Sequence, residues 1–107
     1  MIAARPSYLV QILLPKQTGS GKPVERKWFE SLLEELTDKF GGATSFLRAP
    51  GEGLWQNGSE IENDNIAVVE IMTGDLDLGY WASLRGRLER DLLQEVIVIR
   101  AEEIIHL

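Results

Sequence analysis

Apolar positions follow two different periods along the chain. Short apolar runs at 8–14, 66–72 and 96–101 have the length of strands, and a weaker alternation covers 43–48. At 24–40 and 81–92, apolar residues instead recur every three or four positions, which is typical of amphipathic helices. Gly41 and Gly42 form a stop signal after the first helix, and Asp75 or Asp77 is placed to cap the second. The chain therefore predicts the order strand, helix, strand, strand, helix, strand.

This order favours a single α+β domain over residues 1–107 with the ferredoxin-like βαββαβ fold. Such a fold has a four-stranded antiparallel sheet with strand order 4-1-3-2 and carries both helices on one face. The 49–65 segment between the second and third strands is long for a loop. Within it, Asn57-Gly58 predicts a small extra hairpin at 54–61, because Asn-Gly suits a two-residue turn.

Side-chain alternation along the strands sorts their residues onto two faces of the predicted sheet. The residues expected to face the helices are Tyr8, Val10, Ile12, Leu14, Val69, Ile71, Ile97 and Ile99. The other face is also largely apolar, and a bare apolar face is unusual on a monomer. We expect a second copy of the chain to cover it and form a homodimer. A small anionic or apolar ligand is an alternative cover, and the 49–65 segment of a monomer is another.

Polar residues interrupt this second face near its centre. The candidate interface or ligand-binding residues are Gln11, Phe46, Arg48, Trp55, Glu70 and Arg100. Among them, Gln11, Arg48, Glu70 and Arg100 form a polar cluster. The Glu70 carboxylate is charge-matched by the two guanidiniums, as buried charges need to be. The group is either the floor of a pocket for an anionic ligand or an ion-pair cluster at a dimer interface, and the second interpretation is favoured. Trp55 is either a binding anchor or a residue that packs the hairpin onto the sheet.

Two further segments are weaker candidates. The loop at 16–23 is rich in glycine and precedes a helix, as anion-binding loops do, but Pro23 stands where a Walker A loop needs Ser or Thr. A flexible connection is the favoured interpretation of this loop. The acidic residues of the first helix are favoured as a solvated face over a metal site; they are Glu30, Glu34, Glu35 and Asp38.

The composition of the chain disfavours several kinds of catalytic site, metal site and partner. The chain has no cysteine and one histidine, His106, so thiolate sites, histidine clusters and a Ser-His-Asp triad are disfavoured. We assign no catalytic residue, no metal ligand and no cofactor. A net charge of −6 and a pI of about 4.7 argue against nucleic acid or an anionic membrane as partner. No apolar run has the length of a membrane span or a signal peptide, so we expect a cytoplasmic protein.

Several stretches between residues 24 and 101 together carry a family resemblance. They are Phe40-Gly41-Gly42-Ala43-Thr44, Gly53-Leu54-Trp55, Asn57-Gly58, Val68-Val69-Glu70 and Leu92-Leu93-Gln94-Glu95-Val96. The chain thus resembles small uncharacterised bacterial proteins, the domain-of-unknown-function families built on Phe-Gly-Gly, Thr and a later Gly-x-Trp. The resemblance implies a ferredoxin-like fold and carries no catalytic signature.

Three functions compete on this basis. The leading hypothesis is a small homodimeric module without its own catalysis, acting through protein or small-ligand binding. The alternative is a cofactor-independent enzyme of the dimeric α/β-barrel type, with a cavity between two sheets and Arg48, Trp55 and Glu70 as participants. A regulatory module that binds a small ligand at a dimer edge is the third.

Overall fold

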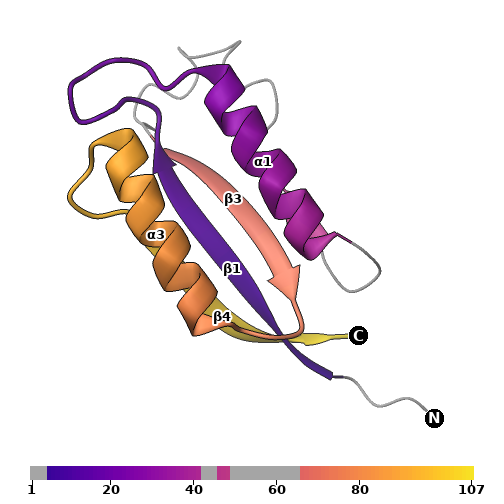
Figure 1. The fold of residues 1–107 in the computed structure, drawn as a ribbon. Coiled ribbons are helices and arrows are strands. Elements are labelled where there is room, and N and C mark those ends of the chain that lie inside the picture. Colours follow the sequence, from indigo (N-terminus) through magenta and orange to yellow (C-terminus); the bar gives the residue numbers. More distant parts are fainter. Residues whose placement is uncertain (1–4, 42–45, 49–65) are drawn as a thin grey trace.

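The computed structural model describes residues 5–41, 46–48 and 66–107 (Figure 1). Its elements follow in the order β1 (Arg5–Pro15), α1 (Arg26–Phe40), β2 (Phe46–Arg48), β3 (Ile66–Thr73), α3 (Leu78–Leu92) and β4 (Val98–His106). The predicted α+β class, with an antiparallel sheet and two helices, is confirmed. The predicted hairpin at 54–61 lies outside the described residues.

Strand β1 lies in the middle of the sheet, where the strands pair in the order β2-β3-β1-β4. It pairs antiparallel with β3 from Tyr8 opposite Thr73 to Pro15 opposite Ile66. On its other side it pairs antiparallel with β4 along almost its whole length. The short β2 pairs with β3 through three residues, so β2 and β4 form the two edges of the described sheet.

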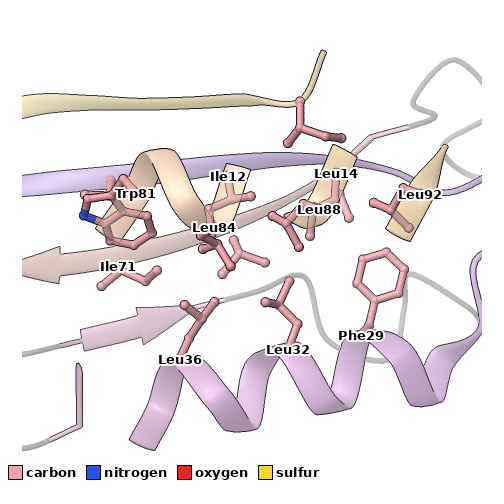
Figure 2. Close-up of a cluster of buried hydrophobic side chains, with 14 of the residues drawn as sticks. Ile12, Leu14, Phe29, Leu32, Leu36, Ile71, Trp81, Leu84, Leu88 and Leu92 are labelled. Carbon is pink, nitrogen blue, oxygen red and sulfur yellow. The ribbon is translucent and has the colours of Figure 1, made fainter. Parts of the chain in front are cut away.

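Alternate side chains of β1 and β3 build the core together with both helices, which cover one face of the sheet (Figure 1). Val10, Ile12 and Leu14 are at most 1% exposed. Figure 2 shows Ile12, Leu14 and Ile71 meeting the apolar stripes of α1 and α3. The stripes contribute Phe29, Leu32, Leu36, Trp81, Leu84, Leu88 and Leu92. The predicted helix-facing set is therefore buried as expected, except that Tyr8 and Ile99 are only partly buried.

The predicted end of the last strand is wrong. Expected at 96–101, β4 instead begins at Val98 and continues to His106. It continues because β1 begins earlier than its apolar run: Arg5 pairs with His106 and Leu9 with Glu102. Backbone pairing extends a strand regardless of side-chain polarity, so the polar residues after Ala101 gave a false stop signal. The long β1–β4 ribbon places the start of β1 beside the end of β4 (Figure 1).

The loop at 16–23, for which a flexible connection was the favoured interpretation, is hydrogen-bonded to the end of α3. The Gly19 N–H donates to the Leu92 carbonyl at 2.9 Å, which satisfies one of the carbonyls that a helix end leaves without a partner. Within the loop, the Thr18 N–H donates to the Lys22 carbonyl at 2.8 Å. Gly21 has φ +88°, a conformation that favours glycine. The loop therefore caps α3.

Replacing Gly19 by alanine tests this cap. A Cβ at position 19 would meet the Leu93 carbonyl oxygen at a distance far below van der Waals contact, so the loop and the end of α3 must separate. We expect Gly19→Ala to lower the free energy of unfolding, measured by urea denaturation, by about 1–3 kcal/mol. Gly74→Ala is the matched control, because a Cβ at Gly74 meets nothing within 4 Å. Equal stability of the two variants would contradict the cap.

Candidate functional site

The face of the sheet opposite the helices carries its side chains in ordered rows; we call it the open face. Strand register places residues of β4, β1 and β3 side by side on it. From β4 through β1 to β3, the rows are Val98, Leu13 and Val68; Arg100, Gln11 and Glu70; and Glu102, Leu9 and Met72. The first row is apolar and the third mostly apolar, while the middle row is polar. Most of these side chains are half-buried, but the β4 members are exposed.

Gln11 holds the middle row together through both ends of its amide. The Gln11 Nε2 donates to Glu70 Oε2 at 2.8 Å, and the Arg100 Nε donates to Gln11 Oε1 at 2.8 Å. A carboxylate on one side and a guanidinium on the other fix which way the amide points, because each end meets the opposite charge. We call these three residues the polar row.

The polar row brings together three of the four residues of the predicted polar cluster, and the backbone of β2 places two further predicted residues beside it. Arg48 stands opposite Glu70 in the backbone register, and Phe46 stands opposite Met72. The remaining predicted residue, Trp55, lies outside the described residues. Four of the six predicted positions, from four strands, therefore fall in one line across the sheet.

A second polar feature joins the two helices on the opposite side of the molecule, and sequence reasoning missed it. The Arg87 Nη2 of α3 donates to both carboxylate oxygens of Glu35 on α1, at 2.8 and 2.7 Å. Nearby, the Trp28 indole N–H donates to Asp91 over a longer 3.4 Å. These groups edge a shallow groove of about 210 Å³ between the helices. Each helix pattern alone gave no signal of it, because the pairing depends on how the helices lie against each other.

The end of the same helix layer holds an aromatic cluster with two buried polar atoms. The Phe40 and Trp81 rings stack at 5.2 Å, Tyr80 meets both rings edge-on, and the Lys39 ammonium lies 4.9 Å from the Tyr80 ring centre. Among the described residues, neither the Tyr80 hydroxyl nor the Trp81 indole N–H has a hydrogen-bond partner. Burial, and then the nearby Glu35 carboxylate, raise the pKa of Tyr80 above 10.0, while Arg87 acts in the opposite direction.

In the described ranges, no group of three or more His, Asp or Glu side chains is placed to hold a metal ion. Glu30 pairs with Arg26 and Glu35 with Arg87, so these two carboxylates of α1 are engaged in ion pairs. Within the same ranges, no helix has the length and apolar character to cross a membrane.

Comparison with protein-family models, with curated proteins and with solved structures finds no match for this chain. The resemblance to the Phe-Gly-Gly families therefore stays a prediction.

Replacing Gln11 by methionine tests the polar row. Methionine has a similar length but bonds neither Glu70 nor Arg100, so both lose a charge-assisted partner. We expect the free energy of unfolding to fall by about 1–2 kcal/mol, because the row is only partly buried. Gln94→Met is the matched control, since among the described residues the Gln94 Nε2 donates a hydrogen bond only to the Gln17 carbonyl, at 3.5 Å. A Gln11→Met loss no larger than that of the control would show that the row is not a stabilising unit.

Replacing Tyr80 by phenylalanine tests the buried hydroxyl. Removing a polar atom that lacks a partner should leave the free energy of unfolding unchanged or raise it by about 1 kcal/mol at neutral pH. Because the folded-state pKa of Tyr80 is raised, the unfolded chain ionises first, and stability falls as the pH rises above 10.0. Tyr80→Phe should lose less stability over that range.

Urea unfolding at neutral pH and above pH 10 measures both effects on Tyr80→Phe. Tyr8→Phe is the control for removing a phenol elsewhere in the chain. A loss of stability in Tyr80→Phe at neutral pH would mean that the hydroxyl has a stabilising partner.

Proposed function

We propose that the chain is a small homodimeric binding module without catalysis of its own, and that two copies meet through the open face. The fold proposed for each copy is ferredoxin-like, with strand order 4-1-3-2, and the location proposed is the cytoplasm. The observation that carries the proposal is the polar row with its apolar neighbours on a sheet face that neither helix covers.

The charge order of the row favours one way of packing two copies. Consider a two-fold axis that runs parallel to β1, midway between two facing sheets. Rotation about it reverses the order of the strands across the sheet, and each row of one copy then lies directly over the same row of the other. Arg100 of one copy then faces Glu70 of the other, two Gln11 side chains meet near the axis, and the Leu13 rows face each other. Facing sheets lie about 10 Å apart, a distance that arginine and glutamate side chains bridge. An axis along the row would instead bring Arg100 against Arg100.

A small anionic or apolar ligand is the second candidate for the open face. The exposed guanidinium of Arg100 at the β4 end of the polar row favours the anionic case. The barrel-type enzyme needs a cavity between two such sheets. Close contact of the Leu13 rows in the proposed dimer leaves no room for that cavity.

A charge on the open face tests the dimer. We expect wild type to have the mass of at least two chains by size-exclusion chromatography with light scattering at high micromolar concentration. Leu13→Asp should lower that mass, because it places two carboxylates against each other in an apolar row. Leu78→Asp is the matched control, since Leu78 is 72% exposed at the start of α3, away from the open face.

Circular dichroism is the check that both variants remain folded. A monomeric wild type, or a Leu13→Asp variant with unchanged mass, would refute dimerisation through the open face. The ligand is then the remaining candidate for that surface.

A further inference from the structure

The outer edge of β4 is a long strand edge that nothing in the described sheet pairs with. Most side chains of β4 are exposed, among them Val98 at 45% and Ile105 at 66%. An edge strand presents a row of backbone N–H and C=O groups, which is a template for pairing with another strand. The other edge strand, β2, has three residues, whereas β4 runs from Val98 to His106.

The sequence of β4 is complementary to itself in one antiparallel register. A two-fold axis perpendicular to the sheet keeps each face of the sheet on its own side, so residues directly opposite each other must point to the same face. The axis therefore lies midway between the two strands, level with one residue that pairs with its own copy. With Ala101 level with that axis, Arg100 stands opposite Glu102 twice and Val98 stands opposite Ile104 twice, all on the open-face side of the strand. On the helix side, Ile99 stands opposite Glu103 twice, which is an unmatched pair but not a like-charge one. Opposite charges and apolar pairs directly across an antiparallel ladder are the favourable combinations.

The other registers that pair most of the strand bring like charges together. With the axis at position 102, Glu102 faces its own copy and Arg100 faces the apolar Ile104. With the axis at position 103, Glu103 faces its own copy. Like charges directly opposite destabilise a strand pair.

We propose that a second copy of the chain pairs with β4 through this register, in addition to the open-face contact. The pairing forms one continuous sheet across both copies, with all four helices on one side and both open faces on the other. The positive Arg100 and the negative Glu102 and Glu103 then favour this register over the others. The same charges keep the unpaired edge soluble.

A single cysteine on the axis tests the register directly, because the chain has no cysteine of its own. Opposing Cα atoms in an antiparallel pair lie about 4.5–5.5 Å apart, within the roughly 4.4–6.8 Å that a disulfide spans. Ala101→Cys should therefore convert almost completely to a covalent dimer under mild oxidation, seen on a non-reducing gel. Ala101 is exposed and on the helix side of the sheet, so the substitution leaves the core intact.

Glu103→Cys is the matched control, exposed on the same side of the same strand. In the proposed register its two copies lie four residues apart along the ladder, about 14 Å, so cross-linking should stay near background. Equal cross-linking of both variants would indicate random collision and overturn the proposal, as would failure of Ala101→Cys to cross-link.

Two further arms separate this contact from the open-face contact. Ala101→Cys made together with Leu13→Asp should still cross-link. The β4 pairing is thus tested even if the open-face contact does not form. In the Leu13→Asp background, where the open-face contact is already broken, Arg100→Glu should lower the mass of the remaining non-covalent assembly, and adding Glu102→Arg should restore it, because the exchange recreates both opposite-charge pairs. Loss of mass in the single variant without recovery in the exchange would overturn the register.

Discussion

The pairing of β1 with a strand on each side is the constraint on which the rest of the structure depends. Gln11 stands opposite both Glu70 and Arg100 in this register, and alternation along β1 then turns Val10, Ile12 and Leu14 toward the helices. A slip of one residue would exchange the two faces, with Gln11 entering the core and Ile12 leaving it. The packing of both helices and the composition of the open face therefore follow from one register.

The polar row helps to specify that register. A glutamine among leucine and valine side chains would cost free energy without partners, and here both ends of its amide are satisfied. Those bonds form only when Gln11, Glu70 and Arg100 lie level, so any shifted pairing of β1 with β3 or β4 loses them. The row thus contributes more to choosing one arrangement than its net stabilisation suggests, which is a recognised use of partly buried polar groups.

Sequence patterns predicted the features that depend on period, and missed those that depend on three-dimensional contact. The two-residue period placed Gln11, Arg48, Glu70 and Arg100 on one face, because strand alternation is a local property. The end of β4 was predicted too early because Glu102 and Glu103 have the polarity of a loop, while their backbone pairs with β1. The Gly19 cap on α3 was missed because its partner, the Leu92 carbonyl, is remote in sequence.

Symmetry limits how the open-face contact and the β4 contact can combine. The axis of the first runs along β1 between two sheets, and the axis of the second stands perpendicular to the sheet beside Ala101. If two such axes do not intersect, repeating both contacts builds an open assembly that grows without limit. A closed assembly needs axes that meet at one point. With a net charge of −6 on every chain, an open assembly accumulates charge as it grows, and repulsion opposes its extension. A closed four-chain assembly requires the open-face axis to move from β1 to the seam between the two β4 strands. Arg100 would then lie opposite a glutamate of β4 instead of Glu70, so charge matching survives that shift as well.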